Sequence, residues 1–376
     1  MKYIILVSLL ISTLISGAQR LISFEEAGKG WGFKDSTNKI IIEPKYKEYQ
    51  YSPSEKVIAV LLNNRWGLID NIGKEIIPPK YDFLAYFREG FAVVSLDDKF
   101  GFINSAGKEI IPLKYEGAAS FSEGLAAVQM NDKWGVIDRT DKLIIPFQFK
   151  NGITFQEGFA AVSNGEGLGF IDKTGKLIAN YKYEFTTGFS EGLAAVEVKG
   201  KSGYIDKTGK EIIPLKYQSA EPFREGLAKV SINGKSGFIN KTGKVIIPLK
   251  YNDANNFREG IAAVSINDKW GYLNKTGRLI IPLKYNEVQD FENYEAGVNL
   301  NSKWGVIDRT GKMIIPCQYD SRPYFLEGLA AVKNNGKWGF IDRIIIWLSL
   351  IDIMEYHTTL SVVLPGCMIT TISFII

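Results

Sequence analysis

The acidic residues that could do chemistry in this 376-residue chain recur at fixed intervals. A Glu-Gly pair returns with the Glu at positions Glu89, Glu123, Glu157, Glu191, Glu225, Glu259 and Glu327. An Asp or Asn returns at Asp35, Asp70, Asn104, Asp138, Asp172, Asp206, Asn240, Asn274, Asp308 and Asp342. Glycoside hydrolysis needs two carboxylates in one cleft, and calcium needs several close together. One carboxylate per interval supplies neither, so we expect these side chains to cap turns or face solvent.

Other catalytic chemistries lack their residues. The "TGK" triplets suggest a phosphate loop, but five residues separate Gly203 from Gly209 where that loop has four, and Glu211 stands where a magnesium-binding Ser or Thr is needed. His357 is the single histidine, so no histidine-based triad or zinc cluster can form. We therefore expect no catalytic residue, no metal and no cofactor, and the chain is not expected to be an enzyme.

Aromatic residues leave one binding hypothesis open. A Trp precedes a Gly in several intervals, and a Tyr or Phe follows fifteen residues later. Such rings could form a core between repeats or an exposed ladder that binds a ligand. The candidate ligand-binding residues are Trp66, Trp134, Trp270, Trp304 and Trp338. Because Ser202 and Ser236 take the same position, the sequence indicates a slot that is only partly buried.

An internal repeat sets all of these positions. The residue before the first Gly recurs after one step of 35 residues and then in steps of 34, at Trp31, Trp66, Phe100, Trp134, Leu168, Ser202, Ser236, Trp270, Trp304 and Trp338. Each copy holds three short β-favouring runs, such as 125–130, 133–138 and 143–149. Short strands cannot bury a face alone, so copies must stack. The predicted fold is an all-β tandem array of about ten 34-residue three-stranded meanders, solenoid, superhelical or propeller-like.

Two glycine positions in each repeat predict two backbone roles. The Gly after the anchor is present in every copy and indicates a bulge or a close approach of another backbone. The second Gly, seven residues after the anchor, is replaced by Asn38 and Asp141 in two copies. Those are the residues that best tolerate a left-handed backbone, which predicts a turn with positive φ. This structural turn set is Gly73, Gly107, Gly175, Gly209, Gly243, Gly277 and Gly311.

The motifs "KWGFID", "WGVIDRTGK", "EIIPLKY" and "FREGLAKV" occur together at fixed offsets. With them the chain resembles the bacterial WG repeat family, also called KWG repeats, over nearly its whole length after the first residues. Departures are Leu168, Ser202 and Ser236 at the Trp position, Asn180 at the Pro position, and "FENYEAGVNL" at 291–300. The resemblance implies a β-rich repeat array, often exported, with no established catalytic activity of the repeats.

Both ends differ from the array. Residues 1–18 combine Lys2, an apolar run and Ala18 before the expected cut, which predicts a signal peptide and export to the periplasm, cell envelope or exterior. The repeat array is assigned to 19–343. In the anomalous apolar tail 344–376 every repeat position fails together, so it is predicted to lie outside the repeat fold. A changed reading frame, a membrane anchor and a capping element are the alternatives.

Charge narrows the expected partners. Lys and Arg number 45 and Asp and Glu 41, with both signs scattered, so no nucleic-acid partner is predicted. The expected function is an exported non-catalytic scaffold that binds a macromolecule, preferably a protein, through an extended face. The alternative is binding of carbohydrate or another cell-surface polymer through surface aromatics. A membrane is an expected partner only if the tail is an anchor.

Overall fold

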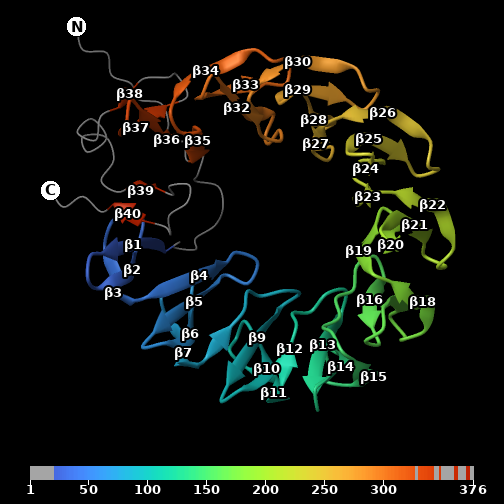
Figure 1. The fold of residues 1–376 in the computed structure, drawn as a ribbon. Helices are drawn as coiled ribbons and strands as arrows, with labels where there is room; N and C mark the ends of the chain where they lie inside the picture. The colour runs from blue at the N-terminus through green and yellow to red at the C-terminus, as the bar shows by residue number, and fades with distance from the viewer. Residues whose placement is uncertain (1–20, 327–328, 343–346, 349–359, 363–369, 373–376) are drawn as a thin grey trace, which may run out of the picture. The chain divides into compact units, whose positions relative to one another are not determined.

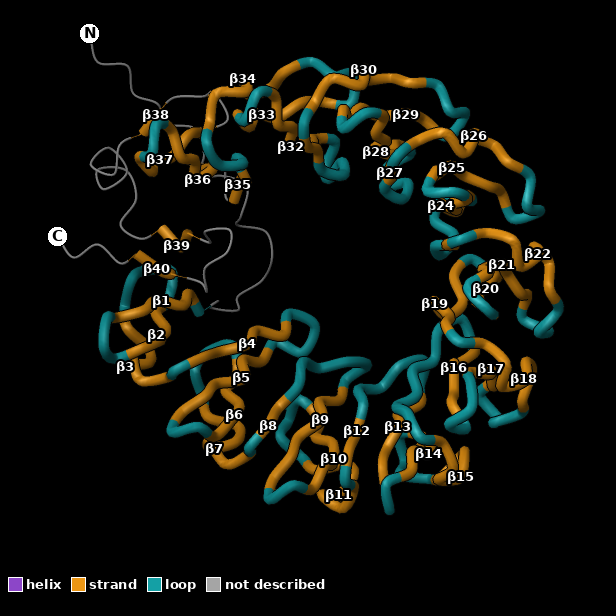
Figure 2. The backbone as a smooth tube through the Cα atoms, in the orientation of Figure 1, coloured by secondary structure: helices purple, strands orange, loops and turns teal. Residues whose placement is uncertain are grey.

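The structure, a computed structural model, describes residues 21–326, 329–342, 347–348, 360–362 and 370–372. The predicted signal peptide and most of the predicted tail lie outside these residues. Within them every regular element is a β-strand, drawn orange in Figure 2. None of the described residues belongs to a helix long and apolar enough to span a membrane.

The contacts group the chain into two compact units that divide in sequence between Ser120 and Phe121. The first unit (Figure 1) contains β1 (Ile22–Glu26), β2 (Gly30–Lys34), β3 (Ile40–Tyr46), β4 (Glu48–Ser52), β5 (Val57–Leu62), β6 (Arg65–Asp70), β7 (Glu75–Tyr81), β8 (Phe83–Leu84), β9 (Phe91–Leu96), β10 (Lys99–Asn104), β11 (Glu109–Tyr115) and β12 (Gly117–Ala118).

The second unit begins with the repeat anchored at Trp134. Its strands are β13 (Leu125–Met130), β14 (Lys133–Asp138), β15 (Leu143–Phe149), β16 (Phe159–Ser163), β17 (Leu168–Asp172), β18 (Leu177–Tyr183), β19 (Phe185–Ser190), β20 (Leu193–Val198), β21 (Lys201–Asp206), β22 (Glu211–Tyr217), β23 (Ser219–Ala220), β24 (Leu227–Ile232), β25 (Lys235–Asn240), β26 (Val245–Tyr251), β27 (Asp253–Ala254), β28 (Ile261–Ile266), β29 (Lys269–Asn274), β30 (Leu279–Tyr285), β31 (Glu287–Val288), β32 (Glu295–Leu300), β33 (Lys303–Asp308), β34 (Met313–Tyr319), β35 (Tyr324–Leu326), β36 (Leu329–Asn334), β37 (Lys337–Asp342) and β38 (Trp347–Leu348). Two more short strands, β39 (Leu360–Val362) and β40 (Thr370–Ile372), lie in the C-terminal segment.

Each repeat forms one antiparallel sheet whose strands pair in chain order. In the first unit the sheets are β1 to β3, β4 to β7 and β8 to β11. In the second unit β13, β14 and β15 pair in order, followed by the sheets β16 to β18, β19 to β22, β23 to β26, β27 to β30, β31 to β34 and β35 to β38. The predicted all-β tandem array of 34-residue repeats is confirmed, in a solenoid or propeller-like arrangement of small open sheets.

Most sheets have a fourth strand that the sequence pattern did not indicate. In the sheet of β23 to β26 this strand is β23, which pairs with β24 through Ser219 opposite Ser231 and Ala220 opposite Val230. Two residues are too few to show an alternation of apolar and polar side chains, so the sequence pattern does not predict this strand. The three predicted strands are present in each repeat sheet, the sheets β1 to β3 and β16 to β18 have these three alone, and most others add a fourth, the number usual in a propeller blade.

The hydrophobic core lies between successive sheets. One cluster joins Phe238 and Ile247 of the sheet β23 to β26 with Val264 and Leu273 of the sheet β27 to β30, and all four are essentially fully buried. Equivalent clusters join the neighbouring pairs of sheets in this unit. Removing one sheet would expose the inner face of the next, which is why the repeats are stable only as an array.

The recurring Asp or Asn holds the turn between the third and fourth strands. Asp206 Oδ1 accepts hydrogen bonds from the N–H of Thr208 at 2.8 Å, the N–H of Lys210 at 3.0 Å and the Thr208 hydroxyl at 2.6 Å. Asn240 Oδ1 makes the same three contacts one repeat later. The oxygen acceptor predicted from the Asp and Asn exchange is therefore confirmed, and the charge is not required.

The turn glycines have the left-handed backbone that their replacements predict. The seven glycines of the structural turn set have φ between 78° and 91°, and Asn38 and Asp141 have 67° and 69°. Each of these turns lies against the preceding repeat: a Cβ built on Gly243 would lie 3.4 Å from Ile213 side-chain atoms. Gly209 is tighter, because its Cβ would lie 2.0 Å from the Ile178 carbonyl oxygen.

Gly243 allows a direct test of this backbone requirement. Gly243→Val is expected to lower the free energy of unfolding by about 1 to 3 kcal/mol, because a β-branched residue is strained at positive φ. Gly243→Asn is expected to cost less than about 1 kcal/mol, because Asn tolerates this conformation and the space is sufficient. Urea denaturation of both variants measures the difference. Equal losses would show that the turn does not impose its φ.

The strand β38 extends the last sheet beyond the point where the repeat motif ends. β38 pairs with β37, with Ile341 opposite Trp347, and these residues are three and nine positions after the anchor Trp338. Other repeats pair at the same two positions. Trp347 and Leu348 can pair here because backbone pairing requires only extended residues and not the Gly and Pro of the motif. That 344–376 stand outside the repeat fold stays a prediction.

Candidate functional site

The repeated Glu-Gly pairs form tight hairpin turns. The Glu has φ of 52° to 53° and the following Gly has φ of 78° to 89° in the repeats from Glu89 to Glu259. Positive φ at both central residues is the geometry of a type I′ turn, whose twist matches that of the flanking strands. In the second unit Arg224 and Leu227 pair across one such turn.

The carboxylate of each turn then binds the next repeat. Glu157 accepts the N–H of Glu191 at 2.6 Å and the N–H of Gly192 at 2.8 Å. The Lys207 ammonium, from the same next repeat, lies 3.2 Å from the carboxylate. The same contacts link Glu123 to Gly158 and Lys173, Glu191 to Gly226 and Lys241, and Glu225 to Gly260 and Lys275. We call these contacts inter-repeat clips; they give the recurring carboxylate a structural role.

Acid is expected to weaken an inter-repeat clip. Partial burial raises the pKa of Glu157, whereas the hydrogen bonds from Gly192 and Lys207 lower it by more, so the pKa lies below its usual value. A carboxyl group with a lowered folded pKa stabilises the fold above its unfolded pKa near 4.5, and that stabilisation is lost as the pH falls through the folded pKa.

Glu157→Gln tests this linkage. We expect it to cost less than about 1 kcal/mol at neutral pH, because the clip is partly exposed. The variant should also lose less stability than the wild type between neutral pH and about pH 3.5, because Gln does not titrate. Melting temperatures at the two pH values measure both effects. Glu166→Gln, at an exposed Glu outside the clips, is the control and should behave as the wild type.

The Trp candidates are distributed between core and surface. Trp66 is buried, Trp134, Trp270 and Trp304 are half-buried, and Trp338 is 44% exposed. A buried Tyr or Phe fifteen residues later lies opposite the ring at Trp66, Trp134, Trp270 and Trp304, as Tyr285 is opposite Trp270. In the second unit Leu168, Ser202 and Ser236 interrupt the series. The Trp side chains therefore form no continuous row there.

The two Ser copies of this slot are more buried than most Trp copies. Ser202 and Ser236 are 5% and 7% exposed. A small hydroxyl side chain fits beneath the strand surface where a Trp ring extends to the solvent, and Ser202 Oγ donates to Glu197 Oε2 at 3.3 Å. The partial burial predicted from sequence for this position is thus found at Trp134, Trp270 and Trp304. In the Ser copies the side chain at this position is buried.

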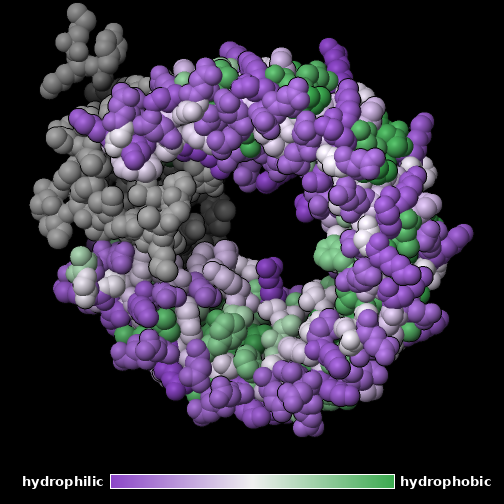
Figure 3. Space-filling view, in the orientation of Figure 1, coloured by the Kyte–Doolittle hydropathy of each residue, from purple (hydrophilic) through white to green (hydrophobic). Residues whose placement is uncertain are grey.

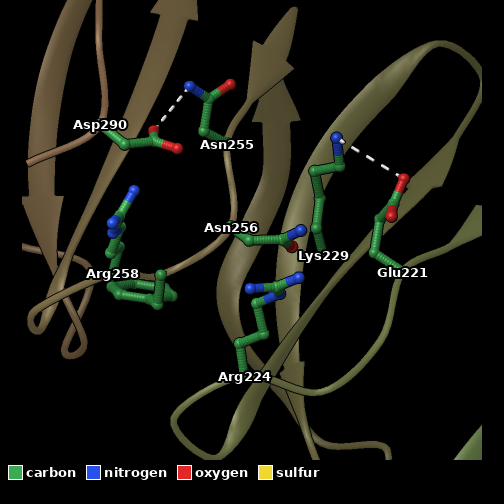
Figure 4. Close-up of a pocket in the computed structure, with 8 residues that line it drawn as sticks. Glu221, Arg224, Lys229, Asn255, Asn256, Arg258 and Asp290 are labelled. Carbon is green, nitrogen blue, oxygen red and sulfur yellow. Dashed lines mark hydrogen bonds and ion pairs between the residues drawn. The ribbon is translucent and has the colours of Figure 1, made fainter. Parts of the chain in front are cut away.

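A polar groove lies in the second unit, over three successive sheets. Its cavity volume is 690 Å³, and it is lined by Glu221, Arg224, Lys229, Asn255, Asn256, Phe257, Arg258 and Asp290. Lys229 lies on β24, and the others lie in the segments that follow the short strands β23, β27 and β31. Figure 4 shows Asn255 directed toward Asp290 and Lys229 directed toward Glu221, with Arg224 and Asn256 on neighbouring segments between these pairs.

Buried aromatic residues hold the groove segments in place. Phe257 is 3% exposed and packs edge to face on Phe238, with ring centroids 4.9 Å apart. The Tyr204 hydroxyl donates to the Glu221 carbonyl oxygen at 2.7 Å, and burial raises the pKa of Tyr204, which keeps this donor neutral. The polar side chains of the groove are therefore displayed on segments fixed to the core.

Several groove side chains bind each other. Asn255 Nδ2 donates to Asp290 Oδ1 at 2.8 Å, and Lys229 Nζ lies 4.0 Å from Glu221 Oε1. Arg258 forms an ion pair with Glu292 at 3.1 Å. By contrast, the side chains of Arg224 and Asn256 have no hydrogen bond or ion pair within the described part of the chain. The groove thus offers two polar groups for a ligand.

Sequence reasoning missed these residues, although one signal was present. Seven positions before the anchor most copies have Ala, and Lys229 is the one charged residue at that place among the copies with a full preceding strand. Among the other groove residues, Glu221, Asn255, Asn256 and Asp290 occupy positions that differ from copy to copy, whereas Phe257 and the Arg at 224 and 258 recur in other copies. A search for recurring residues therefore passes over most of the polar lining of this groove.

Nine consecutive segments of the chain match the WG containing repeat: 31–66, 66–100, 100–134, 134–167, 169–201, 203–235, 237–270, 270–304 and 304–338. The chain belongs to the WG repeat family. In this WG repeat protein the groove combines residues of the recurring "FREG" stretch, such as Phe257 and Arg224, with polar residues that differ between copies, such as Glu221 and Asn256. No curated protein sequence matches the chain.

Solved structures similar to this WG repeat protein are distant. A eukaryotic initiation factor is 10% identical, with a TM-score of 0.45, over 79% of this chain and 95% of that chain. Hsv2 of Kluyvelomyces marxianus is 10% identical, with a TM-score of 0.35, over 63% of this chain and 96% of that chain. AztD of Citrobacter koseri is 12% identical, with a TM-score of 0.33, over 78% and 93%.

Proposed function

We propose that this WG repeat protein is an exported, non-catalytic scaffold that binds another protein. The observation that carries the proposal is the polar groove, in which segments of three successive repeats converge on a 690 Å³ cavity. The motif carboxylates do not support a catalytic role, because Asp206 and Glu157 and their equivalents are used in turns and inter-repeat clips. Variable polar residues displayed on a rigid frame are typical of binding surfaces.

The chemistry of the surface supports a polar partner. Figure 3 shows that the described residues on the viewed face are mainly hydrophilic, with hydrophobic residues in small separate areas. The groove adds charged side chains of both signs, including Arg224, Lys229 and Asp290. Protein partners suit such a lining, because they offer donors, acceptors and both charges in one segment. Export is proposed from the leader-like residues 1–18 alone.

Carbohydrate or cell-wall binding is the second candidate. The Trp338 ring is 44% exposed, and Lys333 Nζ lies 6.0 Å from its centroid, so one aromatic surface accompanied by a cation is present. Aromatic rings contribute strongly where they are accessible to a ligand. The Trp338 ring belongs to one repeat, whereas the groove joins segments of three successive repeats, so we rank protein binding first.

Capture from an envelope extract separates the two candidates. Immobilised protein is incubated with the extract, and bound proteins are identified by mass spectrometry; in parallel, the protein is mixed with insoluble cell-wall material and sedimented. We expect a specific protein to be captured and little co-sedimentation with the wall. Co-sedimentation that is lost in Trp338→Ala, with no captured protein, would favour the carbohydrate candidate and contradict the protein-binding proposal.

A further inference from the structure

We propose that the groove recognises an acidic side chain of its protein partner, with Arg224 as the carboxylate-binding residue. This inference rests on the proposed function and adds the chemistry of the partner. Arg224 is exposed, lines the cavity and has no hydrogen bond or ion pair for its guanidinium among the described residues. Figure 4 shows Arg224 and Asn256 on neighbouring segments of the same cavity.

The other two cations of the groove have partners. Arg258 is paired with Glu292 at 3.1 Å, and Lys229 lies 4.0 Å from Glu221. Arg224 is thus the groove cation whose charge is not matched within the described residues. A guanidinium presents two parallel N–H groups that fit the two oxygens of a carboxylate. The Arg224 guanidinium therefore favours a carboxylate ligand.

Asn256 favours a peptide as the carrier of that carboxylate. A carboxamide donates and accepts hydrogen bonds, and so matches the N–H and C=O groups of a peptide backbone. The Asn256 side chain is half-buried in the groove wall and has neither kind of partner within the described residues. A peptide that places an acidic side chain on Arg224 can place its backbone on Asn256.

The acidic residues of the groove oppose a uniformly charged polyanion. Glu221 and Asp290 line the same cavity as Arg224. An acidic polysaccharide would place repeated negative charges against both carboxylates, which is unfavourable. A peptide with one or two acidic residues among neutral ones avoids this repulsion. The mixed lining thus selects an acidic peptide segment over a polyanion.

Fluorescence anisotropy with defined peptides tests the inference. One labelled peptide contains an Asp-Glu pair among Gly and Ser residues, and a matched peptide has Asn-Gln instead. Binding is measured with the full-length wild type, Arg224→Gln and the control Arg88→Gln, which changes the same position of an earlier repeat outside the groove. Each variant is first checked for a wild-type melting temperature, which an exposed Arg should preserve.

We expect the acidic peptide to bind the wild type more tightly than the neutral one. Arg224→Gln should weaken its binding about fivefold, whereas Arg88→Gln should leave it unchanged. Equal binding of the two peptides, no binding of either at about 1 mM, or no effect of Arg224→Gln would overturn the inference. Tighter, Arg224-dependent binding of dextran sulfate would overturn it in favour of a polyanion. A protein captured equally by wild type and Arg224→Gln would overturn this inference and leave the proposed function standing.

Discussion

Gly237→Ala is expected to lower the free energy of unfolding by about 3 to 4 kcal/mol. Gly237 follows the anchor Ser236 in strand β25, and register shifts flank the pairing of Phe238 with Ile247 in the next strand. A Cβ on Gly237 would lie 2.5 Å from the Ile247 carbonyl oxygen and 2.8 Å from the Leu249 backbone N. Backbone atoms cannot rotate away as a side chain can, so the strands must separate locally.

Gly152→Ala is the matched control for this change. Gly152 lies in the same unit at negative φ, and the nearest atom to an added Cβ is 3.9 Å away on Trp134. We therefore expect Gly152→Ala to change stability by less than about 0.5 kcal/mol. Urea denaturation followed by circular dichroism measures both variants. Similar stabilities for Gly237→Ala and Gly152→Ala would show that the close approach of the strands is not rigid.

Phe257→Ala is expected to cost about 3 to 5 kcal/mol, because it removes a buried ring from the core between two sheets. Phe257 is 3% exposed and packs on Phe238. It also lies between Asn256 and Arg258 in the segment that lines the groove. Its loss should therefore weaken peptide binding in the groove as well as stability.

Tyr86→Ala is the control for loss of an aromatic ring. Tyr86 precedes the equivalent residue Phe87 in an earlier repeat and is 57% exposed, so its removal should change stability by less than about 0.5 kcal/mol. Thermal melting of the two variants gives the comparison. If Phe257→Ala melted within one degree of Tyr86→Ala, the ring would not be part of a packed core, and the groove would lack the fixed base described above.

Much of the fold could be predicted from residues that recur. Exchange of Gly with Asn38 and Asp141 predicted positive φ, and exchange of Asp206 with Asn240 at the equivalent place predicted an oxygen acceptor in a turn. Both predictions follow from a local requirement of the backbone turn that only one or two residue types can meet. Short first strands such as β23 were missed, because two residues are too few to show the alternation of apolar and polar side chains that predicts a strand. The inter-repeat clips were missed because they join Glu157 to a backbone 34 residues away.

The candidate site could not be predicted in the same way. Trp residues attract a binding hypothesis because they are large and recur, but Trp66 is buried and Trp270 packs beside a core cluster. Groove residues such as Glu221 and Asn256 occupy positions that differ from copy to copy and lie about one repeat apart in sequence. Only the packing of successive sheets against one another brings them to one cavity. The one sequence signal of the groove was Lys229, which stands where most other copies have Ala.

Capture from the envelope extract with groove and Trp variants tests most directly whether the groove binds the partner protein. Arg224→Glu with Arg258→Glu reverses the groove charge at two exposed residues, and Trp304→Leu removes a half-buried ring of the predicted Trp set. Only variants that keep a cooperative melting transition are compared. We expect the captured protein to be lost with the double groove variant and retained with Trp304→Leu. Retention by the groove variant and loss with Trp304→Leu would contradict this expectation and return the binding role to the aromatic positions.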